Sequence, residues 1–292
     1  MYKQIKKMPR YLFKLFQHGS VKDVFHIFEN VKLEHLLIAL AARLDRKPTS
    51  IAFRNGLGSH EINQFLDLIP FRKSKITKDI YLWEFGKKQI FANYTQVTGV
   101  HSEYVLGVFD DIYNCDWKNK NVVDIGGFVG DTALYFLSQA ANKVIIYEPV
   151  PKNVVALRLN LQGKENQIQC YEMALSNRNG PVTFYSQEPE GSCGFGQVNE
   201  GNHKVDCLGT TISSILAAHQ PIDIIKVDCE GGEVNLLGMT KEEALSVPHW
   251  IIETHSLELY EGIVNKFTES GFVKTYDQEL GPGVNLLHFK VA

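Results

Sequence analysis

The sequence has few cysteines, and their spacing matches no known framework. The odd count of five argues against a complete disulfide network. No two of them stand in a CxxC arrangement, which also argues against a zinc knuckle. We therefore expect reduced, mostly buried thiols in a cytoplasmic protein. The cysteines are Cys115, Cys170, Cys193, Cys207 and Cys229.

Long apolar runs and a strong charge bias are also missing. No apolar stretch approaches the roughly 20 residues that a membrane-spanning helix needs. The net charge is −3, so the composition gives no indication of nucleic acid binding. Residues 1–17 are basic and aromatic but lack the cleavage site of a secretory signal. They predict an amphipathic helix that packs on the protein, with contact to an anionic membrane surface as the alternative.

The pattern along the chain changes near residue 118. The first part predicts helices over 31–44, 60–68 and 101–113, and a β-hairpin over 79–97. From residue 119 to 292, apolar strands alternate with helices, which is typical of a mostly parallel sheet covered on both faces. The predicted strands are 121–125, 143–147, 167–175, 181–185, 222–228, 250–254 and two within 272–291; the predicted helices are 131–140, 151–161, 211–219 and 257–270.

The segment DIGGFVGD, residues 124–131, follows one of these strands and opens a helix. Its glycines let the backbone approach a ligand closely, and the helix amides offer hydrogen-bond donors. It does not fit the dinucleotide motif GxGxxG, because isoleucine occupies the first glycine position. The carboxylate before the loop would repel a pyrophosphate but suits a zwitterionic amino acid. The structural alternative is a glycine turn used only for tight packing.

Glu148 ends the next predicted strand. A carboxylate at this place can accept hydrogen bonds from both ribose hydroxyls. Ribose occurs in NAD and in S-adenosylmethionine, so Glu148 does not discriminate between them. Its structural alternative is a carboxylate favoured by the N-terminus of the following helix.

The segment IIKVDCEGGE, residues 224–233, is a strand that ends in acidic residues and glycines. Ligands of open α/β sheets bind at the carboxyl ends of strands. Its three clustered carboxylates repel one another and need a partner, which is a cation, a metal, Lys226 or helix amides. A solvated junction with a capping carboxylate is the structural alternative.

Taken in order, the segments VVDIGGFVGDTALYF, IIYEPVPKNVVALRLNL, ALSNRNGPVTFY and IDIIKVDCEGGEVNLL resemble the FkbM family of methyltransferases. The resemblance covers about residues 120–255, and its most specific parts are EPxP and KxDxEGxE. Gly127 and Phe128 depart from the alanine and asparagine that are usual in the family's glycine loop. The resemblance implies a Rossmann-like class I α/β fold, with a seven-stranded, mostly parallel sheet whose last strand is antiparallel.

The same resemblance implies S-adenosylmethionine as the cofactor. The loop after the first strand would hold its methionine part, Glu148 its ribose, and the end of the third strand its adenine. The cofactor-binding residues are then Asp124, Gly126, Gly127, Gly130, Asp131, Glu148, Glu172 and Ala174.

The cofactor's sulfonium methyl is a strong electrophile, so the protein must align an oxygen nucleophile and help to remove its proton. Asp228 is the first candidate for the base or for a metal ligand, and His255 is the second base. Asp228 and Glu253 end strands that should be neighbours, and they resemble the Mg²⁺ site of catechol-type O-methyltransferases. Thr254 or His255 would face Asp228 as well, and would complete the metal shell or act as the base.

We therefore predict O-methylation of a hydroxyl on a small molecule, a sugar or a glycan. The first 118 residues would cover the acceptor site or form a homodimer contact. Two alternatives stay open. A nucleotide-dependent oxidoreductase is disfavoured by the broken GxGxxG and by the lack of a well-placed Tyr-xxx-Lys pair. A non-catalytic binding protein is disfavoured by the intact Asp124, Glu148 and Asp228.

Overall fold

The computed structural model describes residues 72–85, 88–93, 104, 109–186, 195–196, 203–281 and 283–292. The chain divides into two compact units, Met1–Asn114 and Cys115–Ala292, and each is described by itself. The sequence placed this boundary after residue 118. The basic start and the helices predicted over 31–44 and 60–68 lie outside the described residues.

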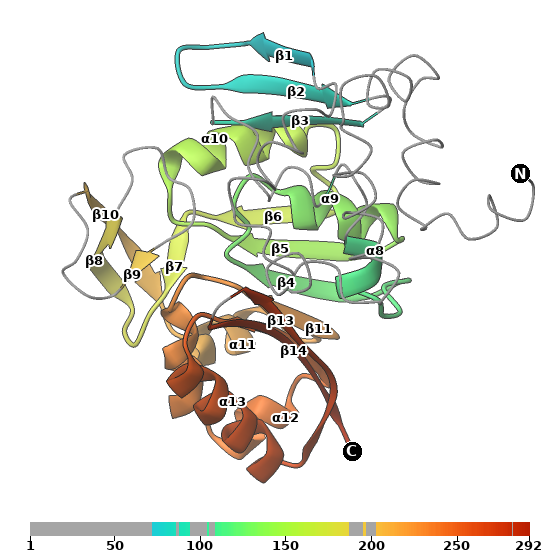
Figure 1. Cartoon of the computed structure of the whole chain (residues 1–292), viewed down its shortest axis with the longest axis vertical. Coiled ribbons are helices and arrows are strands. Elements are labelled where there is room, and N and C mark those ends of the chain that lie inside the picture. The colour runs from blue at the N-terminus through green and yellow to red at the C-terminus, as the bar shows by residue number, and fades with distance from the viewer. Residues whose placement is uncertain are drawn as a thin grey trace, which may run out of the picture. The chain divides into compact units, whose positions relative to one another are not determined.

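The first unit contains a three-stranded antiparallel sheet of β1 (Arg72–Lys75), β2 (Tyr81–Phe85) and β3 (Lys88–Ala92) in that order (Figure 1). The strands β2 and β3 form the hairpin that the aromatic and β-branched pattern predicted. The strand β1 was not predicted, because its sequence RKSK is basic rather than apolar. It pairs with β2, whose Trp83 is buried. A short helix, α8 (Phe109–Ile112), falls within the range predicted as helix.

The second unit is built on a seven-stranded sheet in the order β13-β14-β12-β11-β4-β5-β6. Neighbours from β12 to β6 are parallel, whereas β14 runs antiparallel to both β12 and β13. The last strand is therefore the one that runs against the rest of this sheet, which confirms the predicted class I topology. The strands are β4 (Asn121–Ile125), β5 (Lys143–Tyr147), β6 (Ile168–Tyr171), β11 (Ile224–Val227), β12 (His249–Thr254), β13 (Phe272–Gly281) and β14 (Val284–Val291).

Helices cover both faces of this sheet (Figure 1). On one face lie α9 (Asp131–Ser138) and α10 (Pro151–Asn160). The other face carries α11 (Ile212–His219), α12 (Lys241–Leu245), α13 (Leu257–Glu269) and the 3₁₀ helix η1 (Gly232–Gly238). Their apolar residues form one core with the sheet, in which the Trp250 ring meets Phe267 edge to face. Strands buried on both faces explain the almost continuous apolar runs of the sequence.

A second, four-stranded sheet has the order β7-β10-β8-β9. It corrects the prediction of one strand over 167–175, because the chain breaks at Glu172 and β7 (Met173–Leu175) leaves the main sheet. The predicted strand at 181–185 is β8 (Gly180–Ser186), and it joins this small sheet together with β9 (Phe195–Gly196).

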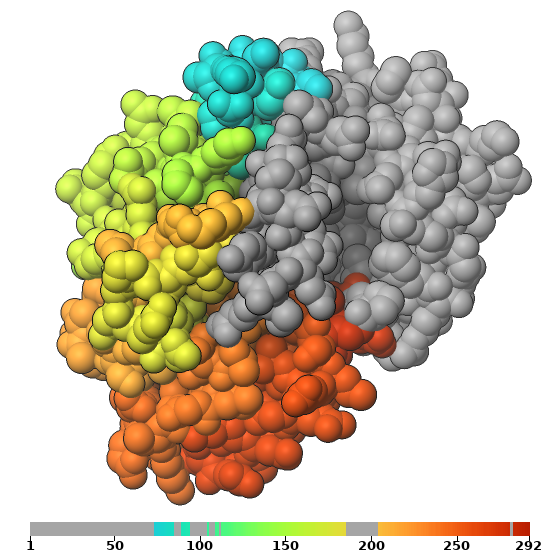
Figure 2. Space-filling view, turned by 90° about the vertical axis from the view of Figure 1, so that its left-hand side faces the viewer, coloured from blue at the N-terminus to red at the C-terminus, as the bar shows by residue number. Residues whose placement is uncertain are grey.

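The strand β10 (His203–Thr210) was missed from the sequence. Residues 204–208 alternate between exposed and half-buried, and Leu208 is 51% exposed, so no apolar run marked the strand. Pairing with β8 on one side and β7 on the other makes it a strand. In Figure 2, β8 and β10 lie at the surface as the yellow and amber patch.

Candidate active site

The glycine loop between β4 and α9 passes against the end of β11. Gly126 has φ +83°, and a Cβ on it would lie 1.7 Å from the main-chain oxygen of Asp228. Its amide and that of Gly127 both donate to the Tyr147 carbonyl, at 2.9 and 3.1 Å. Only glycine fits at position 126, because the position requires both a positive φ and the absence of a side chain.

The other two glycines of the loop serve close packing. A Cβ on Gly127 would lie 2.1 Å from the Ile146 side chain, and one on Gly130 would lie 3.2 Å from Leu157. Gly130 has φ +82° and precedes α9 directly. For these two positions, the packing interpretation raised by the sequence has direct structural support.

Asp124 is completely buried at the end of β4. It accepts a hydrogen bond from the Thr132 hydroxyl at 2.5 Å, and its Oδ1 lies 3.3 Å from the Lys226 ammonium. Burial raises the pKa of Asp124, although the charge of Lys226 opposes the shift. Asp131, at the first position of α9, is also buried, and burial raises its pKa to about 7.

Glu148 lies just beyond β5 and is buried. Its Oε2 accepts a hydrogen bond from the main-chain amide of Phe128 at 2.8 Å. Its Oε1 accepts one from the main-chain amide of Val150 at 2.9 Å and one from the side-chain amide of Asn153 at 3.1 Å. Burial raises its pKa to about 7. Each carboxylate oxygen has two lone pairs, so Glu148 can support the start of α10 and still accept one further donor at Oε2.

The two residues expected near the adenine lie where the chain leaves β6. Glu172 is exposed and pairs with Arg158 at 2.5 Å. Ala174 is buried within β7. Both therefore lie beyond the carboxyl end of β6, as the sequence predicted, and Glu172 is occupied by a surface ion pair.

Lys226 is the residue that sequence reasoning undervalued. It is 1% exposed in the middle of β11. Its Nζ donates to the Gly126 carbonyl at 3.0 Å, and it lies 3.3 Å from a carboxylate oxygen of Asp124 and of Asp228. The signal was present, since a lysine in the apolar strand IIKV must find charged partners to be buried.

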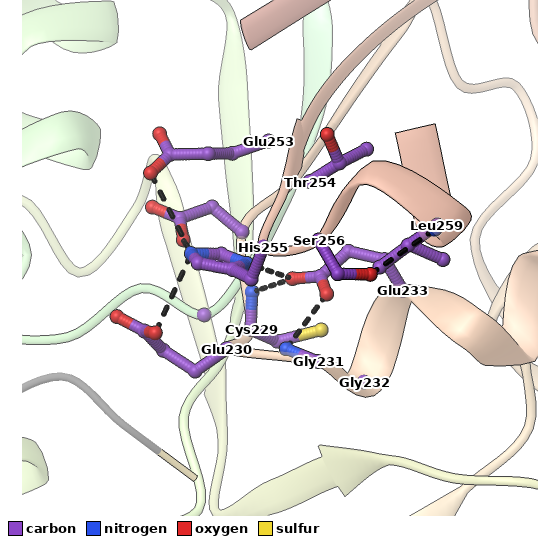
Figure 3. Close-up of polar contacts among 12 residues, drawn as sticks. Cys229, Glu230, Gly231, Gly232, Glu233, Glu253, Thr254, His255, Ser256 and Leu259 are labelled. Carbon is purple, nitrogen blue, oxygen red and sulfur yellow. Dashed lines mark hydrogen bonds and ion pairs between the residues drawn. The ribbon is translucent and has the colours of Figure 1, made fainter. Parts of the chain in front are cut away.

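His255 follows β12 and is surrounded by four carboxylates. Its Nε2 lies 3.4 Å from Glu230, 3.6 Å from Glu253 and 3.8 Å from Asp228, and its Nδ1 lies 3.5 Å from Glu233. Figure 3 shows the ring between Glu253 and Glu230, with Glu233 at its other nitrogen. The sequence predicted that Glu253 and His255 face Asp228, and the structure brings the three together.

Glu233 is held more tightly than the other carboxylates. It is fully buried and accepts the amides of Cys229 at 2.6 Å and of Gly231 at 2.7 Å. These amides belong to a turn in which Glu230 and Gly231 both have positive φ. The sequence left Glu230 or Glu233 as a capping carboxylate for the following helix. In the structure Glu233 fastens the turn before η1 and also faces His255.

The carboxylates control the ionisation of this cluster. Burial lowers the pKa of His255, but interaction with Glu233 and Glu253 outweighs it and raises that pKa to about 12. Burial raises the pKa of Glu230 to about 7 and also raises that of Glu253, with the charge of Asp228 adding to both. The cluster has excess negative charge and suits a cation.

Among the described residues, Asp228, Glu253 and His255 form one group that could hold a metal ion. One ligand atom of each lies within 4.8 Å of the other two. The sequence predicted the two carboxylates as metal ligands, with Thr254 or His255 to complete the shell, and in this group the third residue is His255.

A Rossmann-like sheet with a glycine loop after its first strand and an acidic residue after its second is common to dinucleotide-binding proteins and class I S-adenosylmethionine-dependent methyltransferases. The antiparallel strand β14 matches the methyltransferase class. The model of the methyltransferase FkbM domain matches residues 124–280, which is more than half of the chain. The chain therefore belongs to the FkbM family of methyltransferases.

No curated protein matches the chain. Solved structures that are similar include the fibrillarin pre-rRNA processing protein of Methanococcus jannaschii, with 11% identity, a TM-score of 0.42, and 76% of this chain and 97% of that chain covered. The ribosomal protein L11 methylase of Lactobacillus delbrueckii subsp. bulgaricus has 13% identity and a TM-score of 0.41, with 69% of this chain and 84% of that chain covered. Magnesium protoporphyrin IX methyltransferase of Synechocystis PCC 6803 has 11% identity and a TM-score of 0.41, with 68% of this chain and 86% of that chain covered.

In the part of the chain that the structure describes, no helix is long and apolar enough to span a membrane.

Proposed function

We propose that this S-adenosylmethionine-dependent methyltransferase methylates a hydroxyl oxygen of a small molecule, a sugar or a glycan. The observation that carries the proposal is the contact between Gly126 and the main chain of Asp228. This contact places the glycine loop, where the cofactor's methionine part would bind, beside the strand end that carries Asp228. Methyl donor and proton acceptor would then share one site.

The reaction would form an O–CH₃ bond, break the S–CH₃ bond of the cofactor and release one proton from the hydroxyl. The products are the methyl ether and S-adenosylhomocysteine. Asp228 is the group that we assign to the proton. His255, the second candidate base, would have to lose its own proton first, because the surrounding carboxylates raise its pKa to about 12. Glu253, 3.6 Å from His255, would help to orient the imidazole.

The cofactor would be held as the family resemblance implies, with Asp124 and the loop at its methionine part and Glu148 at its ribose. Lys226 would support this arrangement, because it contacts both Asp124 and the Gly126 carbonyl. The buried negative charge of Asp124 suits the ammonium group of the methionine part. A divalent cation at Asp228 and Glu253, which the sequence predicted as Mg²⁺, would polarise the acceptor oxygen, but proton removal by Asp228 does not require it.

The test incubates the purified full-length chain with methyl-labelled S-adenosylmethionine and a panel of acceptors that offer hydroxyl, amine, thiol or carbon nucleophiles. We expect label on hydroxyl compounds alone. The variant Asp228→Asn should lose transfer while it still binds S-adenosylhomocysteine. Label on nitrogen or carbon would contradict oxygen as the acceptor, and cofactor binding without any transfer would support the non-catalytic alternative.

A further inference from the structure

We propose that Asp228, Glu253 and Nε2 of His255 form a binding site for a divalent transition metal ion, with Glu233 as the residue that positions the imidazole. The inference deepens the proposed function and rests on it for the role of the ion. Its binding step is independent, because it can be measured without any acceptor.

Two of the three separations between ligand atoms are already close to those that one ion requires, and the third, between Asp228 and Glu253, is at most 4.8 Å. Two ligand atoms at about 2.1 Å from a metal, with ordinary angles between them, lie roughly 3.0–3.4 Å apart. Nε2 of His255 is 3.6 Å from Glu253 and 3.8 Å from Asp228. Shifts of a few tenths of an ångström in the side chains would bring these two separations into that range.

The ligands are fixed by separate elements that meet at one edge of the sheet. Asp228 follows β11, Glu253 belongs to β12, and β11 pairs in parallel with residues 249–252 of β12. His255 is the residue before Ser256, whose hydroxyl accepts the Leu259 amide and begins α13. The spacing therefore follows from strand pairing and a helix start rather than from a loop.

Glu233 gives the imidazole its orientation. Its Oε1 lies 3.5 Å from Nδ1 of His255, and the amides of Cys229 and Gly231 fix both of its oxygens (Figure 3). Metal-binding histidines commonly direct their other ring nitrogen at a carboxylate, which fixes the tautomer and the ring plane. With Nδ1 directed at Glu233, an ion between Asp228 and Glu253 would displace the proton from Nε2 and bind its lone pair.

The imidazole selects the type of metal. Mg²⁺ prefers oxygen ligands, whereas imidazole suits ions such as Zn²⁺, Co²⁺ and Mn²⁺ to a greater degree. Three protein ligands leave at least one position for a water or for the acceptor oxygen. The ion would also offset the negative charge of Glu230, which lies 3.4 Å from the same nitrogen.

The test uses the full-length chain after dialysis against EDTA and then against metal-free buffer. Calorimetry with Mn²⁺, Co²⁺, Zn²⁺ and Mg²⁺ should show one site per chain, at least tenfold weaker for Mg²⁺ than for the other three. The electron spin echo envelope modulation spectrum of the bound Mn²⁺ should show coupling to an imidazole nitrogen. Equal affinity for Mg²⁺, no binding of any of the four ions, or a Mn²⁺ spectrum without nitrogen coupling would overturn the site.

Variants assign the roles of the residues. His255→Ala should weaken Co²⁺ binding by more than 100-fold, and Glu233→Gln should weaken it by roughly 10-fold to 100-fold. Glu261→Gln, an exposed change on α13, is the matched control and should bind as the parent does. Unchanged Co²⁺ binding in His255→Ala would refute the ligand set, and the Mn²⁺ spectrum of the parent decides the matter if a variant does not fold.

Methyl transfer is measured separately. Full transfer to a hydroxyl acceptor by protein that binds no ion would refute the metal site and leave the proposed function intact. Metal binding as described, with no transfer to any hydroxyl, would support the metal site and refute the proposed function.

Discussion

The backbone of Gly126 lies so close to Asp228 that a Cβ on Gly126 would be 1.7 Å from the Asp228 carbonyl oxygen. The relationship ties the cofactor loop to the strand end that carries the proposed base. It predicts that Gly126→Ala damages both stability and binding of S-adenosylhomocysteine. Gly163→Ala is the matched control, because Gly163 has nearly the same φ but open space around it. The control should lose about 1–2 kcal/mol from its positive φ alone.

We expect Gly126→Ala to exceed that loss clearly in urea unfolding and to bind S-adenosylhomocysteine at least tenfold more weakly in calorimetry. If the two alanine variants were equally stable and bound S-adenosylhomocysteine equally well, the contact between the loop and β11 would contribute to neither stability nor cofactor binding.

A second prediction concerns the buried ammonium of Lys226. Lys226→Met would leave Asp124 and Asp228 without this cation at 3.3 Å. Removing one partner of a buried ion pair costs about 3–5 kcal/mol, since the remaining charge stays buried. Urea unfolding near pH 7 measures the loss. The double variant Lys226→Met with Asp124→Asn should recover part of it, and a double variant less stable than Lys226→Met alone would contradict the pairing.

The cofactor assignment predicts the behaviour of Glu148. Glu148→Gln should weaken S-adenosylhomocysteine binding by about 1.5–3 kcal/mol, the range for a hydrogen bond to a charged group. NAD should not bind to the parent. Because Glu148 also accepts the Phe128 and Val150 amides, the melting temperature must be measured beside the calorimetry. Glu261→Gln serves as the control. Binding of NAD without binding of S-adenosylhomocysteine would overturn the assignment.

The protein should lose stability in mild acid because of His249. Burial lowers the pKa of this histidine from 6.5 to about 3 in the folded state. Between those values the unfolded chain binds a proton that the folded chain does not, so stability falls as the pH falls below 6.5. The slope is about 1.4 kcal/mol per pH unit.

Replacing His249 by phenylalanine removes this difference. From pH 6.5 to 5.0 the parent should therefore lose roughly 2 kcal/mol more than His249→Phe, as measured by urea unfolding at each pH. Parallel losses in the two proteins would show that the acid sensitivity arises elsewhere, for example from carboxylates.

The sequence alone determined the fold class and the family, because both depend on local signals. Strands β4, β5 and β11 are short apolar runs, and each is followed by the residues that its position in the sheet requires. A glycine loop or an acidic residue after a strand indicates a binding residue without any information about distant parts of the chain. Asp124, Glu148, Asp228 and Glu253 could therefore be named before any contact was known.

Only the tertiary structure decided what depends on distant partners. The strand β10 exists because β7 and β8 supply its hydrogen bonds, and the break at Glu172 exists because β7 pairs with β10 and not with β5. His255 meets Asp228, Glu230 and Glu233 through the parallel pairing of β11 with β12. Side chains far apart in sequence come into contact only through the pairing of strands, and the local sequence pattern does not specify which strands pair.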